Sequence, residues 1–361
     1  MSKIKIDATR EPRSGEELPI AALEAYLKAH APDLAGTIEV EQFPKGHSNL
    51  TYLLRIGDRE LVLRRPPFGA KIKSGHDMSR EFKVLSGLNP IFSRAPKPWV
   101  YCDDDSVLGA SFYIMERKRG IILRQGVGVS DGLSEDLMRK LSTSLIDTLA
   151  DVHNVDIQAA GLQSFGKPEG YVERQVSGWT RRYRAAQTDD VQVVEQVGQW
   201  LAQNMPPDAG ATLIHNDYKY DNVVLDPDDW TKIIAILDWE MATVGDPLMD
   251  LGTTLGYWLQ KDDPEPLKML PIGPTHLPGN LSRQDFVERY SKRTGHNVDH
   301  VLFYYAYALF KIGVIVQQIY ARFVKGHTQD PRFAVMGKAM EMLMAQADRA
   351  IDKGQIYDLN S

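Results

Sequence analysis

Two short apolar runs near the middle of the chain each end in polar side chains, and this pattern restricts the possible folds more than any other feature. The first run is followed by His215, Asp217 and Asn222, and the second, residues 233–237, is followed by Asp238. A carboxylate such as Asp217 can accept the proton of a hydroxyl group. An amide and a carboxylate offer the hard oxygen ligands that Mg²⁺ prefers when phosphates supply much of its coordination. Asp and Asn are also common turn formers, so other parts of the chain have to support this interpretation.

The spacing of His215, Asp217 and Asn222 resembles the H-R-D-x-x-x-x-N catalytic loop of protein kinases. The whole constellation is similar to the aminoglycoside phosphotransferase family of small-molecule kinases, whose loop reads H-x-D-x-x-x-x-N. The resemblance covers residues 36–325, and its strongest motifs are this loop and the Leu-Asp-Trp-Glu that follows it. Within the superfamily, the segments Leu-Arg-Arg-Pro-Pro, Arg-Glu-Phe-Lys-Val-Leu and Ile-Tyr-Ala-Arg-Phe look closest to the kinase-like domain found joined to some acyl-CoA dehydrogenases.

The resemblance implies a chemical role for each polar residue around the loop. Asp217 would act as the base that takes the proton of the acceptor hydroxyl. Lys219 would be a second catalytic residue, because serine/threonine kinases carry a lysine there that touches the γ-phosphate. Asn222 and Asp238 would hold Mg²⁺ on the phosphates. Most antibiotic kinases of the family lack this lysine, so Lys219 argues against a straightforward resistance enzyme.

Two further residues are expected to support the loop rather than to react. His215 would brace it, and Asp250 would do the same from a helix predicted for residues 247–260. The role of Asp250 is implied by the resemblance of its Asp-x-x-x-Asp-Leu stretch to that of the family. An acid on the surface of the helix is the alternative interpretation.

The first third of the chain carries the strand and turn signals of an antiparallel sheet. Residues 1–16 indicate a poorly ordered arm, and residues 19–30 a helix that ends before Pro32. Five strands are predicted, over residues 39–42, 50–56, 60–64, 98–102 and 111–117, and one helix over residues 78–88 with its N-cap at Ser74.

The chain becomes mostly helical after Gly120, with helices expected over residues 133–153, 170–184, 191–204, 301–324 and 332–348. Together with the sheet, this order predicts an α+β, bilobal, protein-kinase-like fold. Its parts would be an N-terminal arm and helix (1–36), a nucleotide-binding N-lobe with a five-stranded antiparallel sheet (37–118) and a larger C-lobe (119–361).

Arg64 stands where the family carries the lysine of its third strand. A guanidinium reaches farther than an ammonium and pairs bidentately, so Arg does not simply replace Lys. It remains a cation that suits a phosphate and a carboxylate. The carboxylate expected beside it is Glu81, on the helix predicted for residues 78–88.

Two other segments are expected to contact the nucleotide. The turn that contains Gly46 and Ser48 resembles the short phosphate loop of the family, whose backbone N–H groups and hydroxyl would donate to phosphate oxygens. Residues 115–120, with Glu116 and Lys118, would form the hinge between the lobes, where backbone groups contact the adenine edge.

The family builds its acceptor pocket from helical inserts, here residues 170–204 and 271–297. The first insert contains Arg174, Arg181 and Arg182. An aminoglycoside is polycationic and requires an acidic pocket, so this composition favours an anionic or aromatic acceptor. A solvated helix face is the alternative.

Composition narrows the class of protein further. The chain has 361 residues, of which 43% are hydrophobic and 25% charged, as in a soluble protein with two domains or one bilobal unit. A net charge of −6 argues against a general nucleic-acid-binding role. A single cysteine, Cys102, excludes an intramolecular disulfide framework and suits a reducing cytoplasm. Lys311 and Gln317 interrupt the apolar stretch 301–319, which therefore predicts a buried helix rather than a membrane span.

These observations predict a cytoplasmic phosphotransferase, monomeric or homodimeric, that binds neither nucleic acid nor membrane. It would use ATP (or GTP) and Mg²⁺ to phosphorylate a small-molecule hydroxyl acceptor. Narrower alternatives are a hydroxyacyl-CoA kinase and an aminoglycoside 3'-type phosphotransferase. A kinase-like binding module without turnover is the alternative class. It is disfavoured because Asp217, Asn222 and Asp238 are all present, whereas pseudokinases usually lose at least one of these residues.

Overall fold

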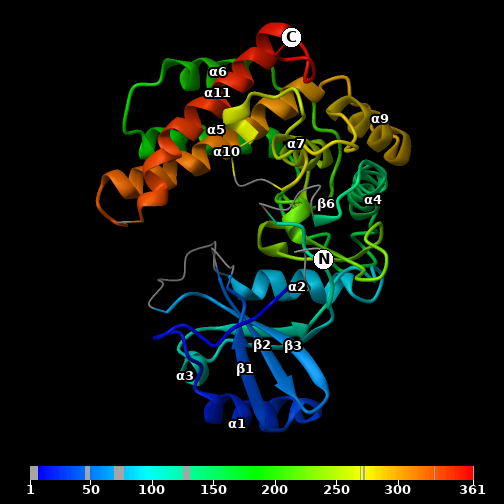
Figure 1. Ribbon diagram of the computed structural model, residues 1–361, viewed down its shortest axis with the longest axis vertical. Coiled ribbons are helices and arrows are strands. Elements are labelled where there is room, and N and C mark those ends of the chain that lie inside the picture. The colour runs from blue at the N-terminus through cyan, green and yellow to red at the C-terminus, as the bar shows by residue number, and fades with distance from the viewer. Residues whose placement is uncertain are drawn as a thin grey trace.

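The structure of the chain is a computed structural model that describes residues 7–44, 49–68, 77–124, 131–268, 270, 273–328 and 330–360. The predictions for Gly46 and Ser48, and for an N-cap at Ser74, lie outside these residues. Figure 1 shows two lobes, a sheet with its helices at one end and a larger group of helices at the other. The predicted bilobal α+β fold is therefore confirmed.

The N-lobe contains a five-stranded antiparallel sheet with strand order β1-β2-β3-β5-β4. Its strands are β1 (Ile38–Gln42), β2 (Leu50–Ile56), β3 (Arg59–Arg65), β4 (Pro98–Cys102) and β5 (Phe112–Glu116). Its helices are α1 (Ile20–His30), α2 (Met78–Leu88) and the single-turn α3 (Asp105–Leu108).

The alternation of side chains along β3 decides which residues face the C-lobe. Successive side chains of a strand point to opposite faces of the sheet. Leu63 belongs to the apolar core that contains α1, whereas Val62 belongs to the core that contains α2 and much of the C-lobe. Arg64 lies on the same face as Val62, so β3 directs this guanidinium toward the other lobe.

The N-terminal arm is tied to the sheet from Asp7 onward, so the prediction of a poorly ordered arm is wrong for the described part. Arg10 exchanges two backbone hydrogen bonds with Gln42, of 3.0 and 2.7 Å. The backbone N–H of Arg13 also donates to the Gln42 side chain at 3.0 Å. The reason is that β1 is an edge strand, whose outer N–H and C=O groups can pair with another segment.

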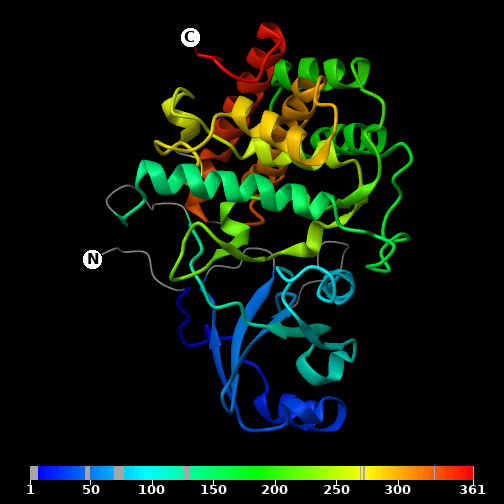
Figure 2. The same ribbon diagram turned by 90° about the vertical axis from the view of Figure 1, so that its right-hand side faces the viewer.

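The C-lobe consists mainly of helices above two short strand pairs. The helices are α4 (Glu135–His153), α5 (Tyr171–Ala186), α6 (Gln192–Gln203), α7 (Pro247–Gly256), α8 (Glu265–Lys268), α9 (Arg283–Thr294), α10 (Val301–Val324) and α11 (Met336–Lys353). The antiparallel pairs are β6 (Thr212–Ile214) with β9 (Thr243–Gly245), and β7 (Val223–Leu225) with β8 (Ile233–Ile236). In Figure 2, α4 crosses the molecule between the strand pairs and the other helices.

Several helices begin or end at other residues than the sequence predicts, mainly where capping side chains or distant segments set the boundary. Asp77 caps α2, because its carboxylate accepts the backbone N–H groups of the first turn. α7 ends at Gly256 rather than at residue 260, and the indole of the nearby Trp258 then donates to the carbonyl of Leu281 at 2.8 Å. α9, which begins with a capping box at Ser282, lies within the helical insert expected at residues 271–297. α11 begins after a 3₁₀ turn and continues to Lys353 rather than ending at residue 348.

α10 is the central helix of the C-lobe and packs against α7 and α11. It is long and apolar enough to cross a membrane, yet 72% of its most apolar window is buried inside the structure. The prediction of a buried helix is confirmed. Lys311 and Gln317, which interrupt its apolar pattern, are only 3% and 2% exposed.

Candidate active site

The loop that follows β6 is held by one buried carboxylate, that of Asp250 on α7. Its Oδ2 accepts the backbone N–H of His215 at 2.6 Å, and its Oδ1 accepts that of Asn216 at 2.7 Å. The Nε2–H of His153 on α4 donates to Oδ2 at 3.1 Å. Asp250 is fully buried, so it is not an acid on the helix surface, and its contacts are those of a support for the loop.

Replacement of Asp250 by Asn is expected to lower the free energy of unfolding by about 3 kcal/mol or more, as when one partner of a buried charged network is removed. Both oxygens of Asp250 accept backbone N–H groups, so the NH₂ of Asn must face one of these donors. Urea unfolding at pH 7 measures the loss. The surface variant Asp147→Asn, which breaks an ion pair with Arg289, should cost at most about 1 kcal/mol.

The loss should depend on pH in a defined direction. Burial alone would raise the pKa of Asp250, but the hydrogen bonds that it accepts from His153 and from the backbone N–H of His215 hold it below its ordinary value. A carboxylate with a lowered pKa stabilises the fold above its unfolded pKa of about 4, and this contribution disappears as the pH falls through the folded value. The difference between wild type and Asp250→Asn should therefore shrink in acid; a constant difference would contradict the assignment.

His215 connects the loop to the residue that follows β8. Its Nε2 lies 2.9 Å from the carbonyl oxygen of Leu237, and its Nδ1 lies 3.3 Å from the backbone nitrogen of Asp217. A carbonyl only accepts and a backbone N–H only donates, so the ring is neutral with its proton on Nε2. Both ring nitrogens are thus used in holding the backbone, as expected of a brace.

The carboxylate of Asp217 lies at the centre of the loop. Lys219 Nζ donates to both of its oxygens at 2.8 Å, and Asn222 Nδ2 donates to Oδ2 at 2.8 Å. Lys219 also lies over the ring of Tyr257, with Nζ 4.6 Å from the ring centre. Asp217, Lys219 and Asn222 come from one short loop, so the spacing in the sequence is sufficient to bring them together.

Arg64 joins the two lobes through carboxylates. Its guanidinium pairs with Glu81 of α2 at 2.5 Å and with Asp238 at 2.9 Å. Glu81 also accepts the backbone N–H of Trp239 at 3.0 Å. The predicted ion pair between Arg64 and Glu81 is therefore present, and it fixes the position of the guanidinium. Asp238 adopts a left-handed backbone conformation, with φ of 66°, in the turn that leaves β8.

A third carboxylate, that of Glu240, completes this group. It accepts the side-chain amide of Asn49 at 2.6 Å and lies 3.6 Å from Arg64. Burial and then the charge of Asp238 raise the pKa of Glu240 to about 8. Burial would also raise the pKa of Asp238, but the adjacent Arg64 outweighs it and holds that pKa below its ordinary value. The structure thus favours charge on Asp238 over charge on Glu240.

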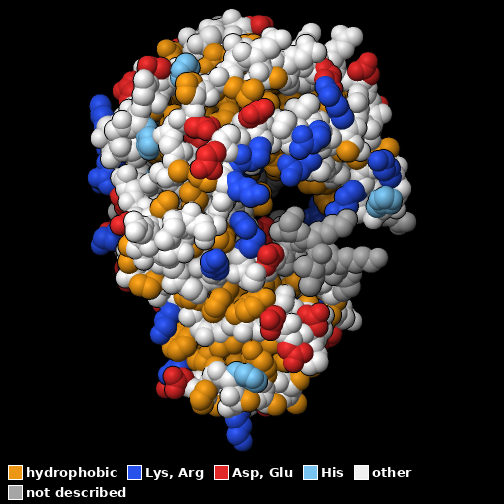
Figure 3. All heavy atoms as spheres, turned by 180° about the vertical axis from the view of Figure 1, so that it is seen from behind, with side chains coloured by type: hydrophobic (Ala, Val, Ile, Leu, Met, Phe, Trp, Pro, Cys, Tyr) orange, Lys and Arg blue, Asp and Glu red, His pale blue; other side chains and the backbone are white. Residues whose placement is uncertain are grey.

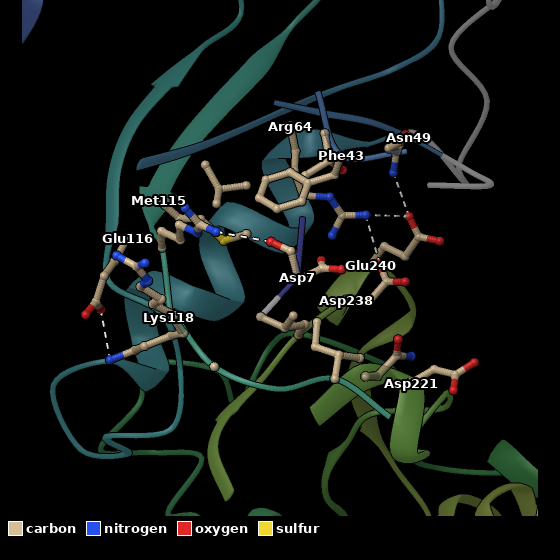
Figure 4. A pocket seen from close by; sticks show the side chains of 18 of the residues that line it. Asp7, Phe43, Asn49, Arg64, Met115, Glu116, Lys118, Asp221, Asp238 and Glu240 are labelled. Atoms are coloured by element: carbon tan, nitrogen blue, oxygen red, sulfur yellow. Dashed lines mark hydrogen bonds and ion pairs between the residues drawn. The ribbon is translucent and has the colours of Figure 1, made fainter. Parts of the chain in front are cut away.

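These residues line a cavity of about 330 Å³ between the lobes. Its apolar wall includes Phe43, Val62, Met115, Ile122 and Leu237, and its polar end includes Arg64, Asp217, Lys219, Asn222, Asp238 and Glu240. Figure 4 shows Arg64 paired with both Asp238 and Glu240, with the hinge residues Glu116 and Lys118 at the other end. An apolar wall that leads to an end with Arg64, Asp217 and Asp238 has the chemistry for a nucleotide with its phosphates at that end.

Asn222 and Asp238 have the donor atoms that Mg²⁺ requires. The hydrogen bonds of the Asn222 amide to Asp217 use Nδ2, so Oδ1 is the atom available to a metal ion. Among the described residues, no group of three or more His, Cys, Asp or Glu side chains is placed to bind a metal. Mg²⁺ is commonly bound by one or two protein ligands together with substrate phosphates.

The predicted acceptor residues on α5 lie outside this cavity. Arg174, Arg181 and Arg182 are exposed on the helix surface. Arg182 stacks on Trp179, 4.5 Å from its ring centre, and its charge acts on the buried Lys311 beside the catalytic loop. The structure therefore does not bring these three arginines together with Asp217 and Asp238 in the cavity.

Sequence reasoning missed several residues of the site. Asp7 lines the cavity from the N-terminal arm, Phe43 from the residue after β1 and Asn49 from the residue before β2. Glu240 had a signal in the sequence, because it lies two residues after Asp238 in the Leu-Asp-Trp-Glu motif. The contact of Asn49 with Glu240 spans 191 residues, and no local pattern indicates it.

Comparison with known proteins finds a matching family model and longer relatives. Residues 39–282 match the family described as "Phosphotransferase enzyme family". The chain is 35% identical over 341 residues to acyl-CoA dehydrogenase family member 11 of Rattus norvegicus. This match covers 90% of this chain and 42% of that protein. The chain is also 34% identical over 338 residues to family member 10 of Mus musculus, and this match covers 93% of this chain and 31% of that protein. The chain thus spans less than half the length of these curated relatives.

Among solved structures, the fold is similar to that of a protein from Ralstonia eutropha assigned as an aminoglycoside phosphotransferase. The TM-score is 0.77 and the sequence identity 30%, and the match covers 92% of this chain and 99% of the other.

Proposed function

Because this chain belongs to the phosphotransferase enzyme family, as its motifs predicted, we propose that it is an ATP-dependent kinase that phosphorylates a hydroxyl group of a small molecule. One observation carries the proposal. The cavity between the lobes brings Arg64 of the sheet to the same charged end as Asp217, Asn222 and Asp238 of the C-lobe. These are the groups that phosphoryl transfer requires, because catalysis consists mainly of positioning and of neutralising charge.

The N-lobe side of the cavity would bind the nucleotide. Val62, Met115 and Leu237 offer apolar contacts for the purine, and the hinge around Glu116 and Lys118 offers backbone groups for its edge. Arg64 would contact the phosphates of the nucleotide. Glu81 fixes this guanidinium before a nucleotide arrives, which reduces the entropy lost when phosphate binds.

The loop side of the cavity would carry out the transfer. Asp217 would orient the acceptor hydroxyl and receive its proton as the oxygen forms a bond to the γ-phosphorus and the bond from that phosphorus to the ADP oxygen breaks. Lys219, which neutralises Asp217 in the structure, would present its charge to the γ-phosphate. Asn222 Oδ1 and Asp238 would hold Mg²⁺, which neutralises phosphate charge when bound.

Release of ADP, or of GDP where GTP is the donor, in the presence of candidate acceptors tests the proposal. The panel should contain aminoglycosides, hydroxyacyl-CoA thioesters and other hydroxylated metabolites, with ATP and GTP compared and Mg²⁺ titrated. We expect Mg²⁺-dependent ADP release with at least one acceptor class. Binding of Mg·ATP without ADP release for any acceptor would instead support the binding module without turnover.

We infer further that the acceptor carries negative charge. Figure 3 shows Lys and Arg side chains gathered around a hollow on one face of the molecule. Arg182 and Lys219 contribute cations on the side of the loop where Lys311 lies. A hydroxyacyl-CoA thioester is one anionic candidate, and the names of the longer relatives make it the first compound to test.

Reversal of charge in the double variant Arg181→Glu, Arg182→Glu should raise the KM for an anionic acceptor and leave that for ATP little changed. Raised salt should weaken acceptor binding in the wild type through screening. Steady-state kinetics at two salt concentrations measure both effects. Arg184→Glu is a matched control, since Arg184 lies on the same helix but pairs with Glu195 at 2.9 Å. Efficient phosphorylation of kanamycin-type polycations would contradict an anionic acceptor and favour the aminoglycoside 3'-type activity.

A further inference from the structure

Lys311 is a buried cation that the transfer mechanism above does not use. It lies in the middle of the apolar helix α10 and is 3% exposed. Its Nζ donates to the carbonyl oxygen of Asn216 at 3.0 Å, the residue between His215 and the base Asp217. A charged ammonium in an apolar core destabilises a fold unless it is paired. Its location beside the loop therefore points to a role other than stability.

The backbone that Lys311 contacts has an uncommon conformation. Asn216 has φ of 65°, in the left-handed region, which asparagine adopts more readily than most residues other than glycine. Its N–H donates to Asp250 at 2.7 Å, and its side-chain amide donates to the carbonyl of Met241 at 3.1 Å. Lys311 holds the remaining backbone group of this residue, the carbonyl of the peptide that leads into Asp217. Such backbone strain persists only where surrounding contacts fix it, and it is common at functional sites.

We propose that Lys311 is a positioning residue for phosphoryl transfer, which fixes the peptide between Asn216 and Asp217 and whose positive charge faces the base. The proposal rests on the proposed kinase function. The charged groups that face Lys311 are Asp217 and Lys219 of the loop, Asp250 of α7 and Arg182 of α5. Protonated Lys311 thus balances two carboxylates, and it holds the Asn216 carbonyl by a charge-assisted hydrogen bond, which is stronger than a neutral one.

The charge on Lys311 should be lost within the range of an ordinary activity assay. Burial lowers the pKa of Lys311 from 10.5 to about 8. The charges of Asp217 and Asp250 oppose this shift, whereas those of Lys219 and Arg182 add to it. The unfolded chain binds this proton more tightly than the folded protein does. Protonated Lys311 therefore destabilises the fold at neutral pH, and this penalty disappears as the pH rises from about 8 toward the unfolded value.

The variant Lys311→Met tests the proposal by separating activity from stability. ADP release from Mg·ATP, measured without acceptor and with any acceptor found in the panel, should fall by on the order of tenfold to a hundredfold, as for a misplaced catalytic group. The Tm at pH 7 should change little, because removal of the buried charge offsets loss of the hydrogen bond to the Asn216 carbonyl. Gln317→Met is a matched control on the same helix, since Gln317 donates to the Ala186 carbonyl at 2.9 Å, away from the loop. It should lower Tm and leave ADP release unchanged.

Two further readouts keep the test independent of one variant. Wild-type ADP release should decline as the pH rises through about 8, and Lys311→Gln, which retains a donor without a charge, should lack this decline. Amide hydrogen exchange at Asn216 and Asp217 should be faster in both variants, even without nucleotide. The proposal would be overturned if Lys311→Met released ADP and exchanged its amide hydrogens at the rates of the wild type. Absence of ADP release from the wild type would instead contradict the kinase function, while the exchange data would still test whether Lys311 holds the loop.

Discussion

Replacement of Asp217 by Asn is expected to lower turnover by on the order of 10²-fold or more, which is the contribution of a positioned general base. A carboxamide cannot take up the proton of the acceptor hydroxyl. The fold should remain intact, because Asp250 rather than Asp217 holds the backbone of the loop. Nucleotide affinity should also change little, since Asp217 contacts Lys219 and Asn222 rather than the hinge. The rate of ADP release at saturating Mg·ATP measures the effect, with calorimetry as the measure of affinity.

Asp147→Asn is a suitable control for this experiment, because it makes the same chemical change in a surface ion pair on α4. It should retain wild-type turnover. Full activity of Asp217→Asn would remove the assignment of Asp217 as the base. A large fall in nucleotide affinity would show that the residue acts on binding rather than on the transfer step.

Replacement of Asp238 by Ala is expected to abolish the part of nucleotide binding that depends on Mg²⁺. The change removes a charged ligand, whose pKa is held below its ordinary value by Arg64, so it is ionised at neutral pH. Asn222→Ala removes a neutral oxygen and should weaken the same binding less. Calorimetric titration of ATP into each variant, with Mg²⁺ and with EDTA, gives the metal-dependent part directly.

The design has to separate the metal from Arg64, because Asp238 also pairs with that guanidinium at 2.9 Å. Binding measured in EDTA reports on the contacts that need no metal, among them the contact of Arg64. Glu116→Ala serves as the control, since it removes a carboxylate from the hinge end of the same cavity and should leave the response to Mg²⁺ unchanged. Equal Mg·ATP affinity of wild type and Asp238→Ala would place the metal site elsewhere.

The parts of the fold that the sequence determined are those with strong local patterns. β2 and α10 begin and end at the predicted residues, 50–56 and 301–324, because alternation in a strand and helical spacing involve only near neighbours. The group of Asp217, Lys219 and Asn222 was also predictable, since six residues of one loop bring these side chains together. The ion pair of Arg64 and Glu81 required knowledge of a family, because the spacing of two residues on different elements has no local signal.

Only the tertiary structure decided the surroundings of the loop. Asp250 holds a backbone 35 residues away, and Lys311 reaches Asn216 across 95 residues of sequence. In the sequence, Lys311 is only an interruption of an apolar helix. Burial and neighbouring charges determine whether such a group is ionised, and both depend on which segments pack together. The sequence thus determined which chemical groups are present, whereas the packing of distant segments determined their charge and position, because desolvation and long-range contacts arise only in the folded chain.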